Sequence, residues 1–103
     1  MIRVAIVGLG AAARHIHLPA YARLKGRVTV VAGCDPDSTA RSFAREKWQV
    51  PEVFEDARAM IEKTRPDAVS ICTPPALHYD LALMVLEAGC HVFCEKPLAV
   101  DLQ

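Results

Sequence analysis

The chain has 103 residues, of which 52% are hydrophobic, and this suits one domain with a modest core. Its 12 Lys and Arg residues balance 12 Asp and Glu residues, so it has no broad positive field that would hold a nucleic acid or an anionic membrane. No apolar run approaches the ~20 residues that a membrane span requires.

The N-terminus superficially resembles a secretion signal, because Arg3 precedes an apolar run over residues 4–9 and three alanines. A single Arg is a thin positive region, however, and cleavage after the alanines would remove the glycine motif described below. Without an export signal, the four cysteines are predicted to be reduced core residues: Cys34, Cys72, Cys90 and Cys94. We therefore expect a cytoplasmic protein. We expect no metal site, because the cysteines lack both Cys-x-x-Cys spacing and a second ligand pair.

The first elements are predicted from apolar runs and helix-stop signals. Ile2–Val7 is apolar and β-branched, as in a strand that is buried on both faces. A helix follows to about Leu24, with Gly26 as its stop, and Pro19 within it predicts a kink or two short helical pieces. Val28–Cys34 is the second predicted strand.

Strands and helices then continue to alternate along the chain. The remaining predicted elements are a helix capped by Asp37 or Ser38 that runs to about Lys47, a short strand over residues 52–54, a helix capped by Asp56 that ends before Pro66, a strand over residues 67–72, a helix ending at Gly89, and a strand over residues 91–94. This order predicts right-handed crossovers and an α/β fold, a doubly wound parallel sheet of the Rossmann type. The last residues, 98–103, resemble the start of another helix, so we expect the domain to be truncated before its last elements.

The helix that ends at Gly89 has two apolar faces. One face is expected against the sheet and consists of Leu77, Leu81, Met84, Val85 and Ala88. Leu83 and Leu86 lie on another face, so this helix is expected to pack on more than the sheet.

The motif Gly8-x-Gly10-x-x-Ala13 follows a predicted strand and opens a helix, which is the context of a dinucleotide site. Gly8 permits a tight turn, Gly10 lets the backbone approach a pyrophosphate, and Ala13 allows close helix–strand packing. A purely structural turn and a methyl-donor site are the alternatives for this loop.

Asp35 ends the second predicted strand, 22 positions after Ala13, close to the spacing of a ribose-binding acid. Its carboxylate can accept hydrogen bonds from the adenosine ribose hydroxyls and would repel a 2′-phosphate by about 1–4 kcal/mol at contact distance. Asp35 therefore predicts NAD as the cofactor, with NADP disfavoured. Arg41 can partly offset this repulsion, although Asp37 is its expected partner at i, i+4.

Later residues add candidates at the carboxyl ends of strands. Thr73 is expected where a dinucleotide crosses an open sheet, and His78 follows within the next helical turn as either a ligand or a solvated residue. His15 and His17 cannot share a helix face, and we interpret both as loop or packing residues, with a role toward the substrate as the alternative. Lys96, in Glu-Lys-Pro after the last strand, can exchange a proton near a reacting carbonyl.

Two segments carry a family resemblance: Cys-Thr-Pro-Pro-Ala-Leu-His at residues 72–78, and Glu-Ala-Gly-Cys-His-Val-Phe-Cys-Glu-Lys-Pro-Leu-Ala at residues 87–99. With them the whole chain resembles the N-terminal domain of the glucose–fructose oxidoreductase, inositol dehydrogenase and MocA family. The resemblance implies that Lys96 reaches the nicotinamide and the substrate. It also implies a set of residues that line the cofactor: Gly8, Gly10, Ala12, Ala13, Asp35, Thr73, Pro74, His78 and Glu95.

The chain departs from the family pattern in two ways. Members often have Asn at the position of Pro75. Members also continue into a second α/β domain that supplies a catalytic His and Asp and mediates oligomerisation, so residues 1–103 are expected to be an incomplete dinucleotide-binding domain.

The functional prediction is an NAD(P)-dependent oxidoreductase, of which this chain is the cofactor-binding part and is inactive alone. It would transfer a hydride between nicotinamide and a hydroxyl or carbonyl carbon of a sugar, cyclitol or related small molecule, and its full-length form would be a homo-oligomer. The alternative is a non-catalytic dinucleotide-binding or redox-sensing module on the same fold.

Overall fold

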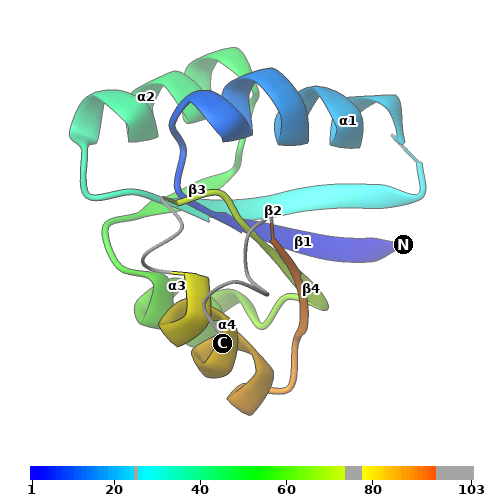
Figure 1. The fold of residues 1–103 in the computed structure, drawn as a ribbon. Helices are drawn as coiled ribbons and strands as arrows, with labels where there is room; N and C mark the ends of the chain where they lie inside the picture. The colour runs from blue at the N-terminus through cyan, green and yellow to red at the C-terminus, as the bar shows by residue number, and fades with distance from the viewer. Residues whose placement is uncertain (25, 74–77, 95–103) are drawn as a thin grey trace.

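The computed structural model describes residues 1–24, 26–73 and 78–94, and it contains a five-stranded parallel sheet (Figure 1). The strands lie in the order β3-β2-β1-β4-β5, and every neighbouring pair is parallel. Their bounds are β1 Ile2–Val7, β2 Val28–Cys34, β3 Glu52–Phe54, β4 Ala68–Ile71 and β5 His91–Cys94. The predicted strands are therefore confirmed, with β4 shorter by one residue at each end.

Helices cover both faces of this sheet. Figure 1 shows α1 and α2 on one face and α3 and α4 on the other, so the sheet is doubly wound as predicted. The helices are η1 Ala13–His17, α1 Leu18–Arg23, α2 Ser38–Lys47, α3 Ala57–Thr64 and α4 His78–Glu87. None of the helices in the described ranges is long and apolar enough to cross a membrane.

Aspartates cap two of the helices. The side chain of Asp37 accepts a hydrogen bond from the amide of Thr39 at the start of α2, and Asp56 accepts one from the amide of Ala59 at the start of α3. An N-cap of this kind contributes about 1 kcal/mol to helix stability.

The first helix is divided, as Pro19 predicted. Ala13–His17 forms a π-helical segment, and an α-helix begins at Leu18 with the proline in its first turn. A proline cannot donate to the preceding turn, and the wider π segment before it accommodates this loss. The helix ends before Gly26, whose φ is +99°.

The core consists of one apolar layer on each face of the sheet. Alternation along β1 sends Ala5 and Val7 toward the α3 and α4 side, where they pack with Met60, and Ile6 toward the α1 and α2 side, where it packs with Leu18. Burial on both faces explains why the strand sequences are almost continuously apolar.

The predicted faces of α4 are largely confirmed. Val85 is fully buried, and Leu81 and Met84 pack partly buried against the same core layer. Ala88 is exposed, so its assignment to the buried face was wrong: α4 ends at Glu87, one residue before it. Leu77 lies outside the described residues.

The second apolar face of α4 is open in this domain. Leu83 is 42% exposed and Leu86 is 57% exposed. Ala82, which the helical pattern did not single out, is buried instead.

Candidate functional site

The carboxyl ends of the strands lie level along one edge of the sheet. Val7 pairs with Cys34 on one side and with Ile71 on the other, and Cys34 pairs with Phe54. Cys94 continues this row, since it pairs with Ile71. The loops that follow the strands therefore leave the sheet at a common edge, where open α/β sheets bind ligands.

Gly8 begins the loop after β1 and has no room for a side chain. Its φ is +92°, and its amide donates to the carbonyl oxygen of Cys34 at 2.8 Å. A Cβ on Gly8 would lie 2.9 Å from Cγ2 of Thr73 and 3.1 Å from backbone atoms of Cys72 and Thr73. The loop after β1 thus depends on glycine to pack against the end of β4.

Gly10 faces open space, in contrast to Gly8. A Cβ built on Gly10 would meet no atom of residues 1–24, 26–73 and 78–94 within 4 Å, so packing within this described part does not require a glycine there. Close approach of a ligand to the backbone is a reason for a glycine at such a position.

Two alanines follow at the start of the first helix. Ala12 is half-buried and precedes η1, and Ala13 is fully buried in the core between helix and sheet. The small side chain of Ala13 lets the helix approach the sheet closely, as the motif predicted.

Asp35 is hydrogen-bonded to the glycine loop. Its Oδ2 accepts a hydrogen bond from the amide of Leu9 at 2.8 Å, and its Oδ1 accepts one from the amide of Asp37 at 2.9 Å. Its own amide donates to the carbonyl of Phe54. These bonds hold the half-buried carboxylate at the edge of the sheet, and each oxygen retains a lone pair for a ligand hydroxyl.

Arg41 does not pair with Asp37, so that prediction was wrong. Its Nη1 donates to the carbonyl oxygens of Asp35 at 2.8 Å and Pro36 at 3.0 Å, and its Nη2 lies 3.9 Å from a carboxylate oxygen of Glu55. The carboxylate of Asp37 is occupied by capping α2, and the carbonyls of the β2–α2 turn are nearer acceptors for the guanidinium.

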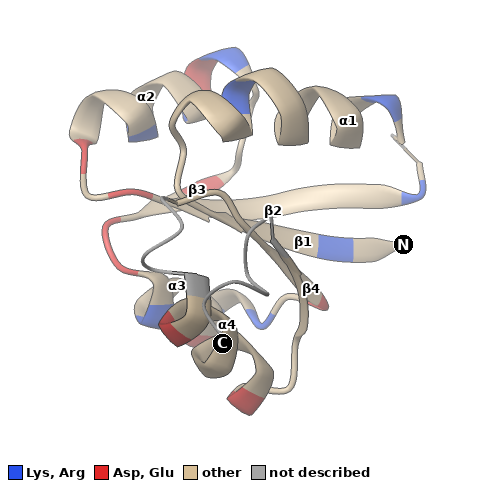
Figure 2. Ribbon diagram, viewed as in Figure 1, with Lys and Arg blue, Asp and Glu red and all other residues tan. Residues whose placement is uncertain are grey.

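These loops surround a cleft of about 410 Å³. Its lining includes Gly8, Gly10, Asp35 and Thr73 of the predicted site, together with Glu55 and Asp56. Figure 2 shows acidic segments where β2 leads into α2 and where β3 leads into α3. The cleft is therefore edged by carboxylates.

Glu55 and Asp56 were not among the residues predicted to line the site. The available signal was their position directly after β3, the same relation that Asp35 has to β2. The sequence predicts this strand at its observed bounds, but the dinucleotide motif specifies an acid only about 20 residues after its glycines.

Several predicted site residues fall outside what the structure describes. Pro74, Glu95 and Lys96 lie beyond the described ranges, as does Pro75. His78 is the first residue of α4, although the position of its side chain is not described.

The two N-terminal histidines have different surroundings. His15 is exposed, whereas His17 is buried and packs edge-on against Phe93 of β5, with 5.5 Å between ring centroids. The packing interpretation is confirmed for His17.

Cys34 and Cys90 are buried free thiols, and Cys72 is half-buried. Burial raises the pKa of the Cys34 thiol to about 12, so this thiol is neutral although it lines the cleft. Within residues 1–24, 26–73 and 78–94, no three His, Cys, Asp or Glu side chains gather closely enough to hold a metal ion.

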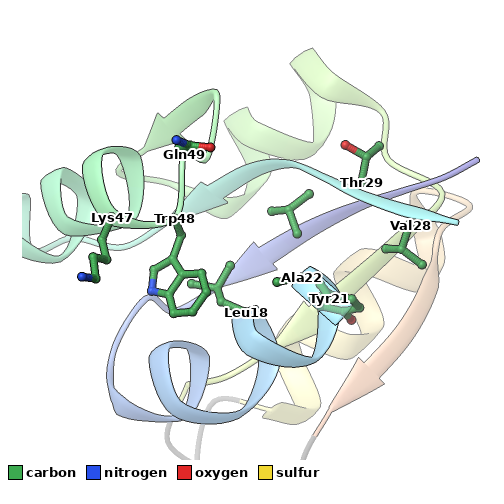
Figure 3. A pocket seen from close by; sticks show the side chains of 9 residues that line it. Leu18, Tyr21, Ala22, Val28, Thr29, Lys47, Trp48 and Gln49 are labelled. Carbon is green, nitrogen blue, oxygen red and sulfur yellow. The ribbon is translucent and has the colours of Figure 1, made fainter. Parts of the chain in front are cut away.

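A second hollow of about 430 Å³ lies between α1 and the end of α2 (Figure 3). Its lining includes Leu18, Tyr21, Trp48 and the first residues of β2. It thus lies toward the amino end of β2, away from the glycine loop and Asp35, and we place the candidate site in the first cleft.

Comparison with known proteins identifies the family. Residues 2–103 match the oxidoreductase family with an NAD-binding Rossmann fold, the glucose–fructose oxidoreductase, inositol dehydrogenase and MocA family. The chain belongs to this family. It is an NAD-binding Rossmann domain of the kind found in sugar and cyclitol oxidoreductases.

Named relatives are dehydrogenases. The chain is 41% identical to D-glucoside 3-dehydrogenase of Escherichia coli over 96% of this chain and 28% of the relative, and 32% identical to inositol 2-dehydrogenase of Pseudomonas fluorescens over 99% and 30%. The structure of scyllo-inositol dehydrogenase from Lactobacillus casei with bound NAD(H) and scyllo-inositol matches with a TM-score of 0.86 and 34% identity, over 94% of this chain and 28% of that chain. The chain thus spans less than a third of these relatives.

Proposed function

We propose that the cleft at the carboxyl edge of the sheet binds NAD(H), and that the full-length protein carrying this domain is an NAD-dependent oxidoreductase. The observation that carries the proposal is the carboxylate of Asp35, tied to the glycine loop by the Leu9 amide and lying in the same cleft as the open Gly10. This arrangement fits a dinucleotide: the backbone at Gly10 is open to the pyrophosphate, and Asp35 offers acceptors to the ribose hydroxyls.

The acidic edge of the cleft favours NAD over NADP. Asp35 lies in the cleft, where a 2′-phosphate would add negative charge beside its carboxylate. At contact distance near a surface, each such charge pair costs about 1–4 kcal/mol.

The remaining residues take their proposed roles from the family motif. Gly8, Ala12 and Ala13 shape the loop, while Thr73, Pro74, His78 and Glu95 line the cofactor. Bound NAD supplies the hydride acceptor at C4 of its nicotinamide ring. Lys96 exchanges a proton with the oxygen of the substrate carbon that loses or gains the hydride.

The proposed substrate is a sugar, a cyclitol or a related polyol, oxidised at a hydroxyl-bearing carbon. The support is that similar proteins are named as D-glucoside 3-dehydrogenase and inositol 2-dehydrogenase. Those names favour an enzyme over the non-catalytic sensor, which no comparison supports. A second domain, homo-oligomerisation and a cytoplasmic location complete the proposal.

Binding and turnover test these statements separately. Titration of the full-length protein with NADH, followed by nicotinamide fluorescence, should show saturable binding. A panel of glycosides and inositols should then be tested with NAD⁺, and the absorbance at 340 nm should rise as NADH forms. Absence of NADH binding would refute the site, whereas binding without turnover on any polyol would favour the sensor.

A further inference from the structure

The acid that follows β3 has a specific relation to the acid that follows β2. Glu55 and Asp35 line the same cleft, and Arg41 connects the two loops. The guanidinium of Arg41 is largely buried, with 19% of its side chain exposed, whereas 79% of the Glu55 side chain is exposed. Arg41 is therefore the buried, hydrogen-bonded partner, and Glu55 is the partner exposed to solvent.

Arg41 is the residue whose guanidinium would bind the 2′-phosphate of NADP. It lies one helical turn past the β2–α2 turn, and an Arg near this turn accommodates the 2′-phosphate of NADP in Rossmann domains. Here Nη1 of Arg41 donates to the carbonyl oxygens of Asp35 and Pro36, and Nη2 lies 3.9 Å from a carboxylate oxygen of Glu55. The positive charge at this edge is thus already directed toward the protein's own acceptors.

We propose that Glu55 is a specificity-determining residue that excludes NADP by engaging Arg41. The inference rests on the proposed NAD site and adds a second acid to Asp35. Asp35 repels the 2′-phosphate of NADP directly. Glu55 acts chiefly by engaging the Arg41 guanidinium, which would otherwise offset that repulsion. Glu55 thus acts as a positioning residue for Arg41.

The test is a double-mutant cycle in the full-length protein with Glu55→Gln, Arg41→Met and the double variant. The readout is the ratio of the NADPH and NADH dissociation constants, measured by calorimetry at fixed salt. With Glu55 present, Arg41→Met should change this ratio less than about twofold, because the Arg41 guanidinium is already engaged by Glu55 and the turn carbonyls. Glu55→Gln should shift the ratio about tenfold toward NADPH, and this shift should fall to about twofold in the Arg41→Met background.

Glu52→Gln is the matched control. Glu52 begins β3, pairs with Lys63 at 3.0 Å and is not among the residues that line the cleft. Glu52→Gln changes the net charge by the same amount as Glu55→Gln. It should leave the ratio unchanged.

Each other result overturns the proposal. If Glu55→Gln leaves the ratio unchanged, Glu55 does not select the cofactor. If Glu55→Gln shifts the ratio equally in the Arg41→Met background, Glu55 acts through its own charge and not through Arg41. If the parent protein binds neither cofactor, or prefers NADPH, the proposed function fails first and the role of Glu55 falls with it.

Discussion

The amide of Leu9 donates to Oδ2 of Asp35 at 2.8 Å, across 26 positions of sequence. This bond joins the loop after β1 to the end of β2, the two segments that a dinucleotide contacts in this fold. Asp35 therefore has two roles: it holds the glycine loop, and it presents acceptors to the cleft.

The first prediction concerns cofactor choice. Asp35→Ser should narrow the preference for NAD(H) over NADP(H), because it removes the charge that repels a 2′-phosphate. Nicotinamide fluorescence titrations at fixed salt measure both affinities.

Asp35→Asn is the matched control for the loop. It removes the same charge but retains an oxygen that can accept from Leu9, so it should narrow the preference with less loss of overall affinity. Equal or reversed affinities for the two cofactors in the unmodified protein would contradict the role of Asp35.

The second prediction contrasts the two motif glycines. Gly8→Ala should destabilise the protein by about 2–4 kcal/mol, because the left-handed φ is strained and the new methyl group meets Thr73 and the backbone of Cys72. Gly10→Ala should leave the free energy of unfolding nearly unchanged, because no atom of the described residues lies within 4 Å of its Cβ, yet weaken NADH binding by about tenfold.

Urea denaturation and NADH titration of both variants separate these effects. A stable Gly8→Ala variant, or a Gly10→Ala variant with unchanged NADH affinity, would show that the respective glycine is dispensable.

The third prediction concerns Lys96. In the full-length enzyme, Lys96→Met should lower kcat by about 10²–10⁴, the usual effect of losing a general acid or base. The affinity for NADH should change far less. Steady-state kinetics with a polyol substrate decide the matter, and a variant with normal turnover would assign Lys96 a structural role.

The fourth prediction uses the buried thiol of Cys34. Burial raises its pKa from 9.0 to about 12, so the folded state keeps this thiol neutral where the unfolded state ionises it. The resulting stability is fully present below pH 9 and is lost as the pH rises toward 12. Urea denaturation at pH 8 to 10.5 should show a steeper decline for the parent protein than for Cys34→Ala. Parallel declines would mean that the thiol ionises equally in both states.

The fifth prediction concerns association of a polypeptide of residues 1–103. Leu83, Leu86 and Phe93 are exposed, the last on the edge strand β5, and uncovered apolar surface with an open strand edge favours self-association. Sedimentation velocity at several concentrations should show dimers or larger species. A monomer at high concentration with a cooperative melt would show that this surface is tolerated.

The sequence by itself determined the elements and the class of site. Apolar runs located β1 and β2 within their observed bounds, Asp37 and Asp56 marked helix starts, and Pro19 marked the division of the first helix. These signals are local: burial on two faces, a capping oxygen and a missing amide each act within a few residues.

Tertiary structure decided which side chains meet at the edge of the sheet. The bond between Leu9 and Asp35, the engagement of Arg41 by Glu55, and the packing of His17 on Phe93 all join residues from different elements. Such contacts depend on strand order and on the register that aligns Val7, Cys34, Phe54 and Ile71. A helical i, i+4 rule suggested Asp37 for Arg41, but Nη1 of Arg41 donates to the carbonyls of Asp35 and Pro36 in the adjacent turn, and the pairing of β2 with β3 places Glu55 3.9 Å from Nη2.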